Sequence, residues 1–118
     1  MQSVQPILLV GLGGAVGAML RYSITTYIMS TNFPWQVMVI NIVGSLAIGL
    51  LIGSFSKQHY MYLLFATGLC GGFTTFSSFS ADALLLLQQH AFSKFFLYTL
   101  GSFTLGILAT YVGVKIMQ

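Results

Sequence analysis

Charged residues are nearly absent from this chain. Lys and Arg together contribute four residues and Asp and Glu contribute one, so charged residues make up 4% of the 118 positions. Hydrophobic residues make up 57%, and the mean hydropathy is +0.92. A chain with so few polar side chains cannot cover the surface of a soluble globule. The composition therefore indicates a protein of the lipid bilayer.

Other scarcities exclude several kinds of site. Four basic residues are too few for a nucleic-acid surface, so we expect no nucleic acid as a partner. The single cysteine, Cys70, excludes an internal disulfide, and with His59 and His90 it is too scattered for a zinc site. Glutamate is absent, which leaves Asp82 as the only acid. We expect no enzyme, because the chain has no evident acid and base pair.

Four apolar segments are long enough to cross a bilayer, whose hydrocarbon core takes roughly 20 helical residues. They lie near residues 5–28, 35–54, 61–88 and 94–115. The second has no charged residue from Trp35 to Ser54, and the fourth has none from Phe95 to Val114. The sequence predicts an all-α membrane protein, with four transmembrane helices per chain in a single domain over residues 1–118.

The basic residues give no preferred orientation in the membrane. With four spans, both termini and the loop at Lys57 share one side, and the other two loops share the opposite side. Lys57 and Lys115 belong to the first side, whereas Lys94 and Arg21 lie on or toward the second. Cytoplasmic loops normally carry an excess of Lys and Arg. Either the chain inserts both ways and forms an antiparallel homodimer, or the charges are too few to show a bias.

Small residues recur at intervals of four along three segments. They are Gly13 and Gly17, then Ser45, Gly49 and Gly53, and finally Ser102, Gly106 and Thr110. Small residues at this spacing let helix backbones approach closely in lipid. We therefore expect tight helix packing, within one chain or between two.

The stretch GLCGGFTTFSSFSAD, at positions 68–82, is the least regular part of the third segment. That segment has about 28 residues, or roughly 42 Å as a continuous helix, against a hydrocarbon thickness of about 30 Å. Its Gly-Gly pair and the following Thr74 and Thr75 have low helix propensity. We expect helix three to be broken in mid-membrane at about 71–75. Carbonyls freed there, paired across a two-fold axis, would suit a small cation.

After the expected break, helical spacing sorts the side chains into two stripes. Phe76 and Phe79 fall on one face, and Ser77 and Ser80 fall on the neighbouring face about 100° round. Phenyl ring edges and hydroxyl protons both offer partial positive charge to an anion. In membrane helices, however, such residues also contact lipid or other helices. Spacing alone leaves a pore lining and a packing role open.

Three further polar residues lie within the segments. Asn41 is well inside the second, where its amide needs an interhelical hydrogen bond or a ligand. Arg21 is the only basic residue well inside a segment, and it can snorkel, pair with the single acid or set the field for an anion. Asp82 is either an interfacial surface residue or a functional one.

Three motifs, in order along the four segments, resemble the Fluc (CrcB) family of bacterial fluoride channels. They are GGAVGAMLRY at 13–22, NIVGS at 41–45 and GLCGGFTTFSSFS at 68–80, and the resemblance covers essentially the whole chain. It implies a multi-pass protein of the bacterial inner membrane that exports fluoride passively. It further implies a dual-topology antiparallel homodimer with two fluoride pores and a central, structural sodium ion bound by backbone carbonyls at the break in helix three.

The resemblance also implies roles for individual residues. Carbonyls of Gly71 and Thr74 from both subunits would hold the sodium ion. The fluoride pore would use Asn41, Thr75, Phe76, Ser77, Phe79 and Ser80. There the phenylalanines would offer ring edges, the asparagine an amide N–H, and the hydroxyl side chains a track for the ion. Arg21 matches the family's arginine of helix one, whose role stays undefined, and Ser78 replaces the threonine of many relatives.

A small four-helix drug or cation exporter is the alternative function. Such a transporter needs an intramembrane carboxylate to couple its substrate to protons, and Asp82 lies several residues beyond the expected break. A scaffold protein that transports nothing would explain the packing glycines but not the polar centre of the third segment. The fluoride channel is therefore the function that we expect.

Overall fold

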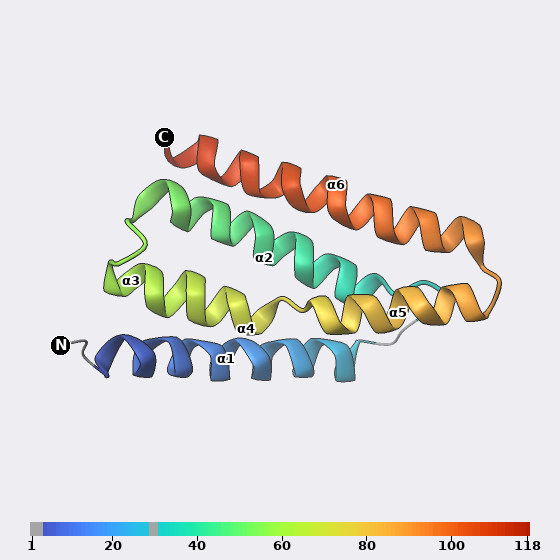
Figure 1. The fold of residues 1–118 in the computed structure, drawn as a ribbon, viewed down its shortest axis with the longest axis horizontal. Helices are drawn as coiled ribbons and strands as arrows, with labels where there is room; N and C mark the ends of the chain where they lie inside the picture. The colour runs from blue at the N-terminus through green and yellow to red at the C-terminus, as the bar shows by residue number, and fades with distance from the viewer. Residues whose placement is uncertain (1–3, 29–30) are drawn as a thin grey trace.

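Four helical spans run alongside one another in a computed structural model that describes residues 4–28 and 31–118 (Figure 1). The spans are α1 (Gln5–Tyr27), α2 (Trp35–Ser54), a third span made of α3 (Tyr60–Tyr62), η1 (Leu63–Cys70), α4 (Gly71–Phe73) and α5 (Phe76–Gln88), and finally α6 (Phe92–Met117). Each span is long and apolar enough, by length and composition, to cross a membrane. The expected all-α protein with four transmembrane helices is thereby confirmed.

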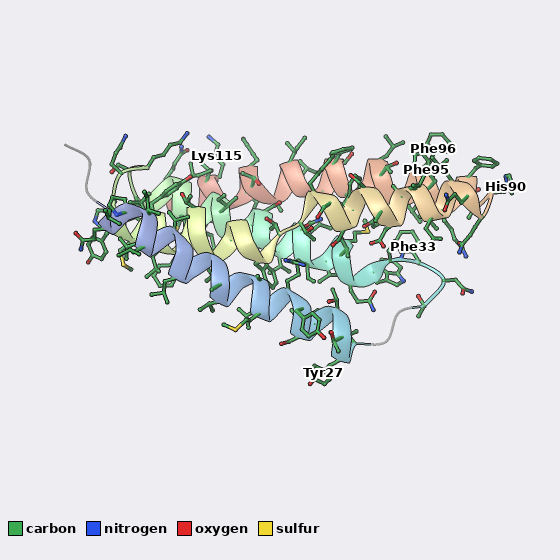
Figure 2. The ribbon with its side chains drawn as sticks, turned by 60° about the horizontal axis from the view of Figure 1, so that its bottom comes forward. Tyr27, Phe33, His90, Phe95, Phe96 and Lys115 are labelled. Atoms are coloured by element: carbon green, nitrogen blue, oxygen red, sulfur yellow. The ribbon has the colours of Figure 1, made fainter. Side chains whose placement is uncertain are left out.

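The third span lies between α1 and α2, and α6 covers the other side of α2 (Figure 1). The most extensive contacts between elements are those of α1 with η1 and α4, and those of α2 with α6. The start of α1, the α2–α3 connection and the end of α6 share one end of the bundle, and the other two connections share the opposite end (Figure 1). Figure 2 shows Lys115 and His90 near these opposite ends.

Large apolar side chains cover much of the outer surface. Ile7 on α1 and Ile107 on α6 are each 71% exposed in the single chain. Side chains project from the bundle along its length, and Tyr27 points away from it at the far end of α1 (Figure 2). Apolar surface this extensive requires an apolar surrounding. The outer faces therefore suit contact with lipid or with a second protein chain.

Glycines bring the paired helices into backbone contact. A Cβ atom at Gly13 on α1 would overlap the carbonyl oxygen of Leu64 in η1, and one at Gly49 on α2 would overlap that of Thr110 on α6. The Thr110 hydroxyl also donates to the Ser45 carbonyl at 3.1 Å. The small residues therefore support close packing within the chain, one of the two forms of packing that their spacing predicts.

The third span leaves helical geometry at two threonines rather than at the glycines. Gly71 is helical (φ −62°, ψ −40°), and α4 continues to Phe73. Thr74 (φ −82°, ψ 156°) and Thr75 (φ −149°, ψ 122°) are extended, and α5 begins at the next residue. The interruption therefore falls at the end of the expected range of 71–75, and the Gly-Gly pair within that range stays helical.

Packing against α1 explains why the glycines stay helical. A Cβ at Gly72 would overlap the carbonyl oxygen of Gly14, so the missing side chain serves helix contact there. The preceding η1 is a π-helix, a wider form that sequence reasoning did not anticipate and that is often found at functional sites. Irregular backbone thus extends on both sides of the Gly-Gly pair.

Candidate functional site

Asn41 on α2 holds the extended residues between α4 and α5. Its Oδ1 accepts a hydrogen bond from the Thr75 N–H at 2.8 Å, and its Nδ2 donates to the Thr75 carbonyl at 3.1 Å. Both backbone groups of Thr75 are therefore satisfied by one amide. An interhelical hydrogen bond was one of the two roles expected for Asn41, and the structure confirms it. One amide proton of Nδ2 remains for another acceptor.

Thr75 also caps the start of α5. Its Oγ1 accepts a hydrogen bond from the Ser78 N–H at 3.1 Å and lies 3.2 Å from the Ser77 hydroxyl. Threonine is a favoured residue at this position, because its oxygen satisfies one of the unpaired N–H groups of the first turn. The cap could have been predicted from a threonine three residues before Ser78, but sequence reasoning placed Thr75 in the break and in the fluoride pore without recognising it as a cap.

Backbone carbonyls on the α4 side of the interruption differ in their partners. The Cys70 carbonyl accepts from both the N–H and the hydroxyl of Thr74, at 2.9 and 2.8 Å. Gly72 accepts from Arg21 Nε at 3.2 Å. Within the described part of the chain, the carbonyls of Gly71 and Thr74 accept no hydrogen bond from the N–H four residues ahead. The two carbonyls expected to bind sodium are thus outside the helical ladder.

Arg21 and Asp82 bind different partners. The half-buried Arg21 donates to Gly72 in the last turn before the interruption, where a cation is favourable because the carbonyls there lack helical donors. Asp82 Oδ2 accepts from the Tyr98 hydroxyl at 3.2 Å. Among the described residues Arg21 forms no ion pair with Asp82, and its hydrogen bond to Gly72 links α1 with α4.

A groove of about 630 Å³ lies between α2, the interruption and α6. Among the residues that line it are six of the expected site residues, namely Asn41, Gly71, Thr74, Thr75, Phe76 and Phe79. The two rings lie 5.8 Å apart between centroids, but Phe79 is 7% exposed against Tyr98 and Phe103, whereas Phe76 is 72% exposed. Of the two rings on this face of α5, that of Phe79 is therefore buried against α6 and that of Phe76 is exposed.

The structure does not bring every expected residue to this groove. Ser77 and Ser80 are exposed and lie outside its lining. Arg21 and Ser78 instead line a second hollow of about 490 Å³, together with Asp82 and Lys94. Three of the five charged side chains of the protein thus meet in that second hollow, and none of the residues described in the groove is charged.

Ser102 on α6 is the lining residue whose importance sequence reasoning missed. Its hydroxyl is buried and, within the described residues, has no hydrogen-bond partner, which is unusual for a polar atom in a protein interior. The sequence placed Ser102 among the packing residues, with Gly106 and Thr110. Gly106 and Thr110 also line the groove. The position of the Ser102 hydroxyl, on the same helix face as these two residues, could therefore have pointed to it.

A metal site of side chains is not found among residues 4–28 and 31–118, where no three His, Cys, Asp or Glu side chains cluster. Backbone carbonyls are the remaining hard oxygen donors at the interruption. Neutral oxygen ligands of this kind suit cations such as sodium better than transition metals. Gly71 and Thr74 are therefore chemically suited to an alkali cation.

Comparison with known proteins extends over nearly the whole chain. The family described as "CrcB-like protein, Camphor Resistance (CrcB)" matches residues 8–114. A relative from Phocaeicola vulgatus is 42% identical, with 94% of this chain and 97% of the relative aligned. One from Flavobacterium psychrophilum is also 42% identical, over 98% of both chains, and one from Thermus thermophilus is 40% identical, over 96% of this chain and 94% of the relative. All three are named fluoride-specific ion channel FluC. With matches of this extent, the chain belongs to the CrcB family.

Proposed function

We propose that this protein is a fluoride-selective ion channel that exports fluoride passively from the bacterial cytoplasm across the inner membrane. The observation that carries the proposal is the 40–42% identity, over almost the full length, to relatives named as fluoride-specific ion channels. The chemistry of the groove between α2 and α6 agrees with an anion as the transported species. An exporter coupled to protons is not favoured, because the only acid binds Tyr98 and lies outside the groove lining.

Fluoride would meet hydrogen-bond donors and ring edges in this groove. The remaining amide proton of Asn41, the unpartnered hydroxyl of Ser102 and the hydroxyl of Thr75 are donors that line it. Phe76 and Phe79 add the positive edges of their rings. Ser77 and Ser80 would continue the hydroxyl track only where a second chain or a side-chain rotation brings them to the ion path.

Selectivity would come from a narrow and mostly dehydrated path. Donors placed for a small, hard anion compensate fluoride for its lost water, whereas a larger chloride ion fits them poorly. No carboxylate lies among the described lining residues to repel the anion. Fluoride enters cells as neutral hydrogen fluoride, ionises in the less acidic cytoplasm and would leave through the channel down its gradient.

A second copy of the chain would complete the path. The groove is open, and Phe76 at its rim is 72% exposed, so one wall is missing in the single chain. An antiparallel homodimer of dual topology would provide that wall twice and give two pores. Reporter tags at each terminus test this arrangement in cells, because dual topology places each terminus on both sides, whereas a single orientation contradicts it.

A structural sodium ion would sit on the axis of that dimer, where the interruption of the third span would lie at mid-membrane depth. The carbonyls of Gly71 and Thr74 fit this ion, because their usual N–H donors are bound elsewhere and neutral oxygens suit an alkali cation. When bound, the ion supplies positive charge that helps to offset the dehydration of fluoride. Arg21 holds the neighbouring carbonyl of Gly72 and so keeps α1 against this part of the third span.

The decisive experiment measures ion release from liposomes. Purified protein is reconstituted into vesicles loaded with potassium fluoride, and a fluoride-selective electrode follows release after an ionophore dissipates the membrane potential. Vesicles loaded with potassium chloride and read with a chloride electrode are the control. We expect rapid fluoride release and little chloride release. Retention of fluoride by vesicles that contain well-folded protein would overturn the proposed function.

A further inference from the structure

We propose that Asn41 and Thr75 are positioning residues for a cation site. Each side chain accepts a hydrogen bond from a backbone N–H group that would otherwise donate to one of the carbonyl oxygens of the site. The inference rests on the sodium site proposed above. It assigns to these two side chains a role toward the cation, which differs from donating a hydrogen bond to fluoride.

The carbonyl of Gly71 is made available by Asn41. In a continuous α-helix the carbonyl of residue i accepts from the N–H of residue i+4, so the Gly71 carbonyl would accept from Thr75. That N–H instead donates to Asn41 Oδ1 at 2.8 Å. The other end of the same amide binds the Thr75 carbonyl at 3.1 Å, which fixes the peptide groups on both sides of Thr75.

The carbonyl of Thr74 is made available by Thr75 in the same way. Its helical donor would be the Ser78 N–H, four residues ahead. That N–H instead donates to Thr75 Oγ1 at 3.1 Å. The two N–H groups taken by side chains are thus the helical donors of the two carbonyls assigned to the cation.

Three of the neighbouring carbonyls accept hydrogen bonds from protein donors. Those of Cys70, Gly72 and Thr75 accept hydrogen bonds from Thr74, Arg21 and Asn41, respectively. Backbone groups without partners are costly in a bilayer, so the backbone N–H and carbonyl groups of a helix in lipid tend to hydrogen-bond to one another. Side chains that bind the N–H groups remove this tendency at Gly71 and Thr74. The cation then provides the missing positive partner for their oxygens.

Thr75 offers a conservative pair of variants for the test. Thr75→Val keeps the shape and the β-branch of the side chain but removes Oγ1, so the Ser78 N–H is free to return to the Thr74 carbonyl. Thr75→Ser keeps the acceptor oxygen. The matched control is Thr99→Val on α6, because the Thr99 hydroxyl only binds the Phe95 carbonyl of its own helix, at 2.8 Å.

The measurement is the melting temperature of the purified protein in detergent, titrated with sodium chloride while potassium chloride keeps the ionic strength constant. The midpoint of this titration is the sodium concentration at which half of the rise in melting temperature is reached. We expect sodium to stabilise the wild type, Thr75→Ser and Thr99→Val, with midpoints within about twofold of one another. Thr75→Val should raise the sodium midpoint about tenfold, which corresponds to the loss of about one hydrogen bond. A purely structural role would instead lower the melting temperature equally in sodium and in potassium.

Asn41→Leu provides an independent second variant, which carries the test if Thr75→Val does not fold. It removes the acceptor of the Thr75 N–H and should also raise the sodium midpoint about tenfold. A wild-type midpoint in the variants that fold would overturn the positioning role while leaving the sodium site in place. Fluoride release by a wild type that sodium does not stabilise would overturn the cation site and this inference but not the channel.

Discussion

The side-chain amide of Asn41 binds both backbone groups of Thr75, a residue 34 positions later in the chain. This single contact ties α2 to the point where the third span is extended. It replaces two backbone hydrogen bonds that a continuous helix would have formed, and it does so inside a segment long and apolar enough for a membrane span. The irregular segment of this protein is therefore supported by a specific side chain.

Replacement of Asn41 with Ala should destabilise the fold. It leaves the carbonyl of Thr75 without its donor and releases the N–H from its acceptor, and a buried group that stays unsatisfied costs about 1–3 kcal/mol. We expect a clear fall in melting temperature in detergent. Asn32→Ala is the control, because Asn32 is an exposed residue between α1 and α2 and should leave the melting temperature nearly unchanged. Equal melting temperatures for the two variants would contradict the structural role of Asn41.

The glycine contacts predict opposite effects for two Gly→Ala changes. A Cβ at Gly49 meets the Thr110 backbone, so Gly49→Ala should force α2 and α6 apart and cost about 1–3 kcal/mol. A Cβ at Gly11 has nothing within 4 Å, so Gly11→Ala should gain about 0.5–1 kcal/mol of helix stability. Thermal unfolding of both variants in the same detergent checks the prediction. It fails if Gly49→Ala is as stable as Gly11→Ala.

The sequence was sufficient for the helices and for the approximate position of the interruption, but not for the residues at which it occurs. Length and composition locate four spans, because a bilayer constrains every membrane helix in the same way. Low helix propensity predicted a break at about 71–75, but packing of Gly72 against Gly14 keeps the first part of that range helical. The partner of Asn41 lies on another helix, so no local pattern could identify it. The π-helical geometry of η1 was likewise not anticipated from the sequence.

The site was predicted unevenly for a similar reason. The helical spacing of Phe76 and Phe79 predicts that both rings lie on one face of the helix, and both rings line one groove. The same spacing could not show that Phe79 is buried by Tyr98 and Phe103, because α6 supplies both. Nor could it show which wall the serines of α5 face. Side-chain direction on a helix follows from sequence, whereas the neighbour that it meets follows from the fold.

If Phe76 and Phe79 offer their ring edges to fluoride, replacement of either residue with Ile should abolish fluoride release, while the two variants differ in stability. Both lose a ring edge. Phe79→Ile also loses aromatic contacts with Tyr98 and Phe103, at a cost of about 0.5–1.5 kcal/mol per pair, whereas the exposed Phe76 loses little in the single chain. Liposome release and melting temperature are measured together. Phe96→Ile, on the outer face of α6, is the control (Figure 2).

These outcomes separate the ring edge from general packing. Release that is unchanged in Phe76→Ile would contradict the ring-edge account, since this variant keeps an apolar side chain of moderate size. Slower release by the control variant would point instead to a general effect of removing an aromatic side chain from the protein surface.

Ser102→Ala should separate stability from transport most clearly. The Ser102 hydroxyl is buried without a hydrogen-bond partner among the described residues, so its removal should leave the melting temperature unchanged or slightly raised. If the hydroxyl donates to fluoride in the groove, its loss should slow fluoride release at least about tenfold, because hydrogen bonds to charged groups are among the stronger ones.

Ser54→Ala is the matched control, since the Ser54 hydroxyl binds the Leu50 carbonyl at 2.7 Å at the end of α2, outside the groove. Fluoride release at the wild-type rate from Ser102→Ala vesicles would show that this hydroxyl does not contact the ion.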